Sequence, residues 1–319
     1  EVKGTKGYFR IPGWSALTYL VRVADIAGNT KNEALGRQVI DVAQTITSYR
    51  EGEAPVDNYH TYSAIAEIYG RVPPACVGTQ DLDAIEVMLS TRWSNATVVP
   101  ELDRAIRSFL TSTNPEDHKK AVRVLELTTQ LRPAEERDHT SKARATKADA
   151  YWLEKLLQNN AKELGRLCRE NAIDCLRNRL RELFGDNYIA SHTWLWRPAI
   201  EEHGQNHRWD NVVNGFVEAM RDGIDSWTDD HAESARKYIE QLLHDDAQIN
   251  RRIAINAIRA KWPQLHQAFG DHLSPELFQI GHIHELYWLL KENFLAMEEA
   301  MKHRVVECIL EAGNQADSE

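Results

Sequence analysis

The sequence has few cysteines and no long apolar run. Its 4 cysteines, in 319 residues, show no Cys-x-x-Cys spacing. A disulfide-dense secreted scaffold is therefore excluded, and we expect a reducing, cytoplasmic location. No apolar segment approaches the roughly 18 residues that a membrane helix requires, so we expect no membrane partner.

Motifs for nucleotide binding and nucleophilic catalysis are also missing. The chain contains neither Gly-x-x-x-x-Gly-Lys-Ser/Thr nor Gly-x-Ser-x-Gly, and no cysteine has a histidine in a local catalytic signature. His282 and His284 suggest a metal site, but alternate residues diverge on a helix and His-Glu-x-x-His is absent. We therefore expect no cofactor, no metal and no catalytic activity in these residues.

A helical magnesium enzyme of the terpene cyclase type is one alternative class, because such all-α enzymes are near this length and hold magnesium with aspartate-rich helices. Asp210, Asn214 and Glu218 share one face of a predicted helix, with aspartate pairs at 229–230 and 245–246. In such enzymes the first aspartate-rich motif comes well before the second, whereas here the pairs follow. The order disfavours this class.

The composition is that of a globular protein. Hydrophobic residues make up 42% and charged residues 27%, which allows one large domain or two of ordinary size. The formal net charge of −10 argues against a surface built throughout for nucleic acid, although a local basic patch remains open. The chain begins at Glu1 rather than at methionine, and we expect it to be a portion of a longer protein.

Apolar residues recur at three- and four-residue spacing along most of the chain, which predicts α-helices. The first helices that we expect cover residues 14–27, 32–49, 58–69, 80–93, 100–111 and 115–131. Later ones cover residues 148–185, 211–224, 232–243, 249–260, 284–293 and 294–310.

The spacing of the first helices suggests a repeat. Those that begin pairs, near Trp14, Asn58 and Pro100, are 44 and 42 residues apart, a period typical of HEAT and armadillo repeats. The predicted fold is all-α, a helical-repeat (α-solenoid-like, HEAT- or TPR-like) array. An irregular helical domain is the alternative.

Residues 133–147 contain no large apolar residue and are predicted to be a linker, because a segment that buries no surface does not offset the entropy lost on ordering. The expected organisation is an N-terminal array over residues 1–132 and a C-terminal helical domain over 148–312. Residues 313–319 are expected to form a polar, frayed tail.

Three of the nine tryptophans lie between residues 187 and 210. Pro198 predicts a short helix that ends at Gly204, preceded by an extended segment at 194–196. Two interpretations remain open: the tryptophans fill a core, or they form a recognition surface. We expect Trp196 to be structural, with Trp209 or Arg197 more exposed. The candidate partner-binding residues are Trp194, Trp196, Arg197, His203, Asn206 and Trp209.

Residues 142–182 carry ten Lys or Arg against six Asp or Glu. A predicted basic helix at 162–182 would place four arginines on its solvated side. A charged face that keeps a helix soluble is one interpretation, and contact with phosphate or nucleic acid is the other. The candidate anion contacts are Arg166, Arg169, Arg177 and Arg181.

Five segments of the chain share a family resemblance: Trp196 to His203 with Asn206, Arg252 to Ile255, His284 to Leu290, and, near the N-terminus, Leu20 to Ala24 and Asn58 to Thr61. Together they resemble the helical C-terminal regions of bacterial antiviral STAND-type NTPases. The resemblance implies a non-catalytic helical-repeat sensor that recognises a viral protein. It also implies that the NTPase and effector activities lie in a part of the protein outside these residues. A scaffold that contacts nucleic acid through residues 162–182 is the alternative function.

Overall fold

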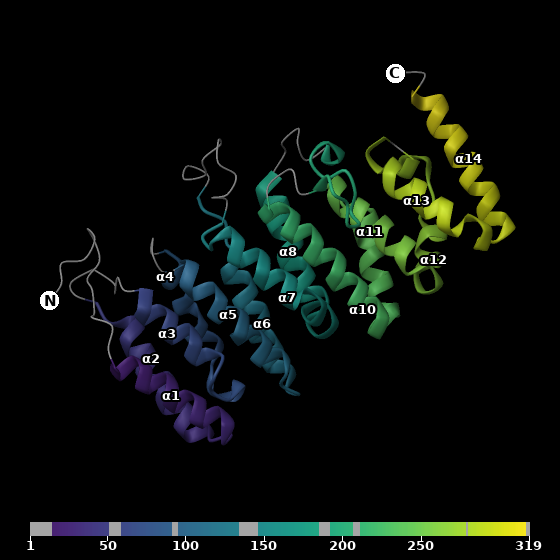
Figure 1. Ribbon diagram of the computed structural model, residues 1–319. Helices are drawn as coiled ribbons and strands as arrows, with labels where there is room; N and C mark the ends of the chain where they lie inside the picture. The colour runs from purple at the N-terminus through teal and green to yellow at the C-terminus, as the bar shows by residue number, and fades with distance from the viewer. Residues whose placement is uncertain are drawn as a thin grey trace. The chain divides into compact units, whose positions relative to one another are not determined.

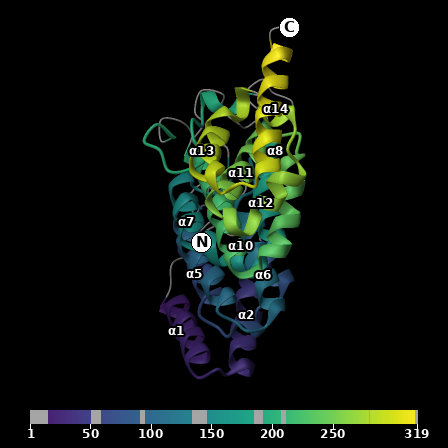
Figure 2. The same ribbon diagram turned by 90° about the vertical axis from the view of Figure 1, so that its right-hand side faces the viewer.

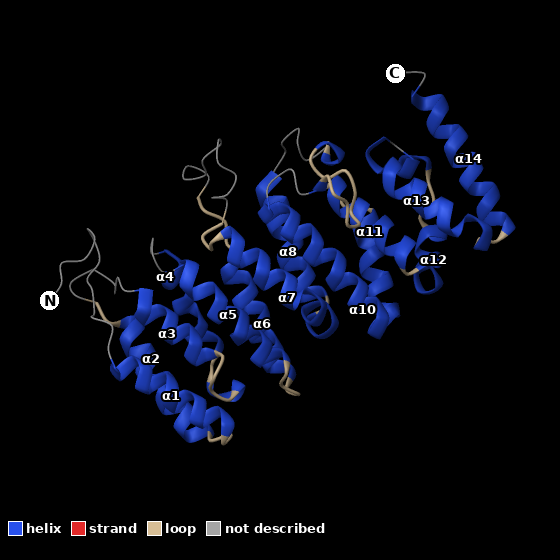
Figure 3. Cartoon of the chain, viewed as in Figure 1, coloured by secondary structure: helices blue, strands red, loops and turns tan. Residues whose placement is uncertain are grey.

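The computed structural model describes residues 15–50, 59–90, 95–133, 146–184, 192–206, 211–278 and 280–316. Over these ranges the chain forms thirteen α-helices, joined by loops and short 3-10 turns, and no β-strand (Figures 1, 2 and 3). The all-α prediction is confirmed. The chain divides into two compact units, Glu1–Asn160 and Ala161–Glu319.

The first unit is built from α1 to α6 and the start of α7. Their bounds are α1 Ser15–Asn29, α2 Glu33–Ser48, α3 Tyr59–Tyr69, α4 Ala84–Ser90, α5 Asn95–Leu110, α6 Pro115–Thr128 and α7 Ala150–Cys168. The Asn32 side chain caps α2 by accepting a hydrogen bond from the Leu35 amide at 3.0 Å, as expected of asparagine before a helix. The core contains Tyr62, Ile65, Tyr69, Leu102 and Phe109.

Two predicted helix starts in this unit differ from the structure. Pro100 lies inside α5, which already begins at Asn95. The buried side chains of Val98 and Val99 extend the apolar face ahead of the proline, and their burial offsets the helical hydrogen bond that proline cannot donate. The helix expected at 80–93 begins as a 3-10 turn at Thr79–Asp83 and becomes α4 only at Ala84.

The ends of the predicted linker are ordered against the first unit. Leu131 and Thr146 form an isolated antiparallel bridge, and the Lys147 amide donates to the Gln130 carbonyl at 2.9 Å. Residues 134–145 of that prediction lie outside the described ranges. The boundary between compact units falls at Asn160 and Ala161, inside α7, rather than at 133–147.

The second unit comprises the end of α7 and the helices that follow. Their bounds are α8 Glu170–Phe184, α10 Asn211–Leu243, α11 Gln248–Ala260, α12 Trp262–Asp271, α13 Ile283–Asn293 and α14 Glu299–Ala316. The helices predicted at 211–224 and 232–243 are the two arms of α10, which meet at a kink at His231. The helix predicted at 249–260 is α11, which ends at Ala260 as expected, and Trp262-Pro263 then opens α12, a helix that was not predicted, because proline fits the first turn.

Two further helix boundaries in this unit differ from those predicted. The predicted basic helix 162–182 is two helices, because Arg169 takes a left-handed backbone conformation (φ 50°) between α7 and α8. At the C-terminus α14 continues to Ala316, past the start of the predicted tail at Gly313. Alanine at 312 and 316 favours the helix.

A close crossing of α7 and α10 requires glycine on both helices. A Cβ atom added to Gly165 would lie 2.0 Å from the Gly223 carbonyl oxygen. Such a distance is far inside van der Waals contact, so only glycine allows the two backbones to approach this closely.

Within each unit, extensive packing joins helices that are near in sequence. The α-helix pairs in extensive contact are at most two places apart in label order, as in α1 with α2 and α3, α3 with α5, and α10 with α11 and α12. No described helix has both the length and the apolar character needed to cross a bilayer.

Candidate functional site

The candidate site is residues 192–206 of the second unit, called here the recognition segment. It begins with a 3-10 turn at Thr193–Leu195, not with the extended strand expected at 194–196. The short helix expected from Pro198 to Gly204 is absent, since residues 198–203 take bends and loop conformations. Both predictions for this segment were wrong.

Hydrogen bonds from side chains explain why no helix forms. The five consecutive carbonyls of residues 197–201 all accept from side-chain donors rather than from amides one turn later. The donors are Arg252, Arg197, Arg221 and Asn206. A helix would need these same carbonyls for its own ladder.

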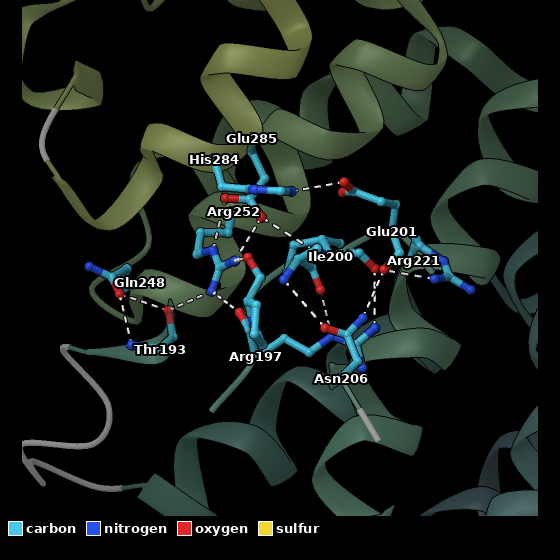
Figure 4. A network of polar contacts seen from close by, with 12 residues as sticks. Thr193, Arg197, Ile200, Glu201, Asn206, Arg221, Gln248, Arg252, His284 and Glu285 are labelled. Atoms are coloured by element: carbon cyan, nitrogen blue, oxygen red, sulfur yellow. Dashed lines mark hydrogen bonds and ion pairs between the residues drawn. The ribbon is translucent and has the colours of Figure 1, made fainter. Parts of the chain in front are cut away.

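Arg252 of α11 is the centre of this arrangement (Figure 4). It is fully buried and pairs with Glu285 of α13 in a two-pronged ion pair, with Nε to Oε2 at 2.9 Å and Nη2 to Oε1 at 2.7 Å. Its other N–H groups donate to Thr193 Oγ1 at 3.2 Å and to the carbonyls of Arg197 at 2.7 Å and Pro198 at 3.1 Å. All five guanidinium hydrogens thus have acceptors, which burial of a charged group requires.

Arg197 is the second buried guanidinium, which corrects the expectation that it is exposed: none of its surface is accessible. Its Nη1 donates to Asn214 Oδ1 at 2.8 Å and to Glu218 Oε1 at 3.0 Å, both on α10. The spacing of Asn214 and Glu218 on one helical face thus serves this arginine. Burial lowers the pKa of Arg197, and the carboxylate of Glu218 opposes that shift.

A third contact fixes the segment to α13. The Glu201 carboxylate accepts from His284 Nε2 at 2.8 Å, and the Ile200 amide donates to Glu285 at 3.3 Å. The hydrogen bond to Glu201 raises the pKa of His284. Burial raises the pKa of Glu201, but the bonds from His284 and from the backbone outweigh it and lower the value to about 2.

The Asn206 side chain forms hydrogen bonds within the recognition segment itself. This buried side chain accepts from the Ala199 amide at 3.3 Å and donates to the Glu201 carbonyl at 2.9 Å. Asn214 then donates to the Asn206 carbonyl at 2.7 Å. Asn206 is therefore a structural residue, not a contact available to a partner.

The other candidate partner-binding residues of the recognition segment differ in their exposure to solvent. Trp196 is buried, with 7% of its surface accessible, as its expected structural role requires. Trp194 is half-buried and tilts against His192 with ring centroids 4.8 Å apart, whereas His203 is exposed. Leu195, which the sequence did not single out, is 59% exposed. Trp209 lies outside the described residues.

The four candidate anion-binding arginines are all engaged by the protein itself. Arg177 and Arg181 both bind the buried carboxylate of Asp245, at 2.5 and 3.0 Å. Burial raises the pKa of Asp245, yet its hydrogen bonds and the charge of Arg177 hold that pKa below its usual value.

The other two arginines contact different elements. Arg166 pairs with Glu163 and with Asp230, and Arg169 contacts the His231 ring at 2.7 Å. The four are therefore spread over partners on α7, on α10 and in the loop that follows α10, and they do not form one free basic face.

Ligand atoms of Glu201, His284 and Glu285 lie within 4.8 Å of one another, a grouping that can hold a metal ion. Both oxygens of Glu285, however, already bind Arg252. His284 donates to Glu201. The Arg252 guanidinium supplies the positive charge that such a carboxylate requires, so the arrangement functions as an ion-pair network.

Sequence reasoning missed the roles of Arg252, Glu285, Gln248 and Thr193. Gln248 Oε1 accepts from both the amide and the hydroxyl of Thr193, at 3.0 and 2.7 Å. The one available signal was the resemblance, because three of its segments supply Arg197, Arg252 and Glu285, which meet here. Comparison with known protein families found no match, and no curated protein is similar in sequence.

Proposed function

We propose that the chain is a non-catalytic helical-repeat module that recognises a protein through the exposed part of the recognition segment. The observation that carries the proposal is the set of hydrogen bonds from buried side chains to the carbonyls of residues 197–201, called here the clamp. Neighbouring side chains of the segment point outward. A segment that is already held in one conformation loses little conformational entropy on binding. It therefore binds a partner more tightly than a flexible segment with the same contacts.

Packing between sequence neighbours supports a repeat architecture. Extensive contacts within each unit join helices at most two places apart, which is how repeat arrays stack. Repeat arrays present extended surfaces to partners. In this proposal Trp194, Leu195 and His203 provide the contact, and Trp196, Arg197 and Asn206 hold its shape.

The resemblance to STAND-type sensors is the reason for proposing a viral protein as the partner and a larger bacterial defence NTPase as the parent protein. The nucleic-acid alternative has less support. Its four arginines are paired with carboxylates or with His231, and an ion pair must be broken before such a side chain binds phosphate.

Site-specific photocrosslinking tests the proposal. A photoreactive phenylalanine analogue at position 195 should form an adduct with a phage protein in infected bacteria and none in uninfected cells. The same analogue at Tyr151, an exposed aromatic residue of the first unit, is the matched control. Identical adducts at both positions, or none at 195 in cells that resist infection, would contradict the proposal.

A further inference from the structure

A cleft of about 700 Å³ lies between α1 and α3 in the first unit, apart from the recognition segment. In both views α1 lies at the edge of its unit (Figures 1 and 2). The volume falls within the range of small-molecule sites, roughly 300–1,000 Å³. The lining residues are Ser15, Leu17, Thr18, Val21, Arg22, Asp25, His60, Ser63, Ala64, Glu67 and Arg71.

At one end of the cleft, two carboxylates share one arginine. Arg71 binds Asp25 at 2.6 Å and Glu67 at 2.6 Å, so both acidic groups of the lining contact the same guanidinium. Arg71 thereby joins the C-terminal parts of α1 and α3. Since α1 and α3 both run toward this end, Ser15, Thr18 and His60 lie near the opposite one.

Arg22 lies between these ends and has no partner among the residues that the structure describes. It makes no hydrogen bond or ion pair, whereas every other arginine in the described ranges makes at least one. On a chain of net charge −10 with abundant carboxylates, such an arginine in a concave site is an available anion-binding group.

Further hydrogen-bonding groups face the same cleft. Ser15, Thr18 and Ser63 contribute hydroxyls, and His60 contributes a ring nitrogen. Two N-terminal segments singled out in the sequence, Leu20 to Ala24 and Asn58 to Thr61, thus place Arg22 and His60 in one cleft. Neither segment takes part in the recognition segment.

We propose that this cleft binds a small molecule through a phosphoryl group, with Arg22 as the principal contact. The planar guanidinium fork matches two phosphate oxygens, and the hydroxyls can donate to the remaining ones. Among the described residues, Arg71 is occupied by Asp25 and Glu67, whereas Arg22 has its whole guanidinium fork available. A phosphoryl group offers three oxygens to Arg22 and the hydroxyls where a carboxylate offers two, and is therefore preferred.

The test is titration of the whole chain with inorganic phosphate and pyrophosphate up to about 20 mM, a range that detects millimolar affinity. Calorimetry and the Arg22 side-chain Nε resonance provide the readouts. Saturable binding should weaken at least tenfold in Arg22→Gln and less in Arg22→Lys. Lys119→Gln, which removes an equal charge from an exposed site on α6, should bind as the original chain does.

Several outcomes would overturn the proposal. They are binding that does not saturate, equal weakening in Arg22→Gln and Lys119→Gln, and acetate that binds as tightly as phosphate. Thr18→Val gives a second variant, expected to weaken phosphate two- to fivefold. Because Thr18 and Arg22 are exposed, circular dichroism should show both variants folded.

Discussion

Arg252 shows how a buried charge can set the shape of a segment. Its guanidinium serves one carboxylate, one hydroxyl and two carbonyls, and each of these loses its donor if the side chain is removed. Arg252→Met should therefore destabilise the second unit by about 3–5 kcal/mol, the cost of breaking a buried ion pair. Urea unfolding followed by tryptophan fluorescence measures this.

The exposed pair of Arg304 and Glu307 on α14, 3.2 Å apart, is the control for that experiment. Arg304→Met should cost far less stability than Arg252→Met, because solvent screens such exposed pairs. Equal losses in the two variants would show that the network around Arg252 adds no more stability than an exposed ion pair.

Two histidines at the start of α13 should give opposite pH dependences. The folded-state pKa of His284 lies above its usual 6.5, so its ion pair with Glu201 stabilises fully below pH 6.5 and is lost as pH rises through the raised value. Burial lowers the pKa of His282 to about 4, with Arg251 acting in the same direction. His282 therefore favours the folded state above pH 6.5 and disfavours it as pH falls from 6.5 toward 4.

The corresponding prediction concerns His284→Gln. This substitution should remove the decline in the free energy of unfolding above pH 6.5, which His284 causes. The decline below pH 6.5, which His282 causes, should remain. Glu201 does not change its charge above pH 6.5, because its folded-state pKa of about 2 and its usual pKa of 4.5 both lie below that pH. Unchanged slopes on both sides would exclude the ion pair as a source of stability.

At the scale of helices, replacing glycine by alanine should have opposite effects on stability at two positions. Gly165→Ala should destabilise the second unit by about 1–3 kcal/mol or more, because its Cβ would strike backbone at the crossing of α7 and α10. Gly313→Ala should stabilise α14 by about 0.4–1 kcal/mol, since nothing lies within 4 Å of the added Cβ and alanine favours a helix. Thermal and urea unfolding of the two single variants provide the comparison, and a stabilised Gly165→Ala would refute the close crossing.

Helix positions were largely predictable, because the three- and four-residue spacing of apolar residues reflects the face that each helix buries. The helix starts expected at residues 32 and 115 were close to those observed, where the side chains of Asn32 and Asn114 cap α2 and α6. The recognition segment was not predictable in this way. Its carbonyls are bound by Arg252, about 55 residues away, so neither Pro198 nor local spacing could reveal its conformation.

At the scale of the whole molecule, the division between units can be tested with fragments. Residues 146–160 contact the first unit through the Leu131 bridge, through Lys147 and Glu86 at 2.9 Å, and through Asn160 and Asp103 at 2.5 Å. A fragment of residues 1–160 should therefore melt at a higher temperature than one of residues 1–133, as followed by circular dichroism. Equal melting temperatures would place the boundary at the linker predicted from sequence.

The clamp on residues 197–201 also bears on how this protein can change over evolution. Because its bonds go to main-chain carbonyls, the shape of the segment does not depend on which side chains occupy the exposed positions 195, 202, 203 and 205. Under the proposed function, substitutions there would alter the contact surface without altering the scaffold that presents it. Such an arrangement would suit a module whose targets diverge, because the exposed side chains could change while the buried arginines stay fixed.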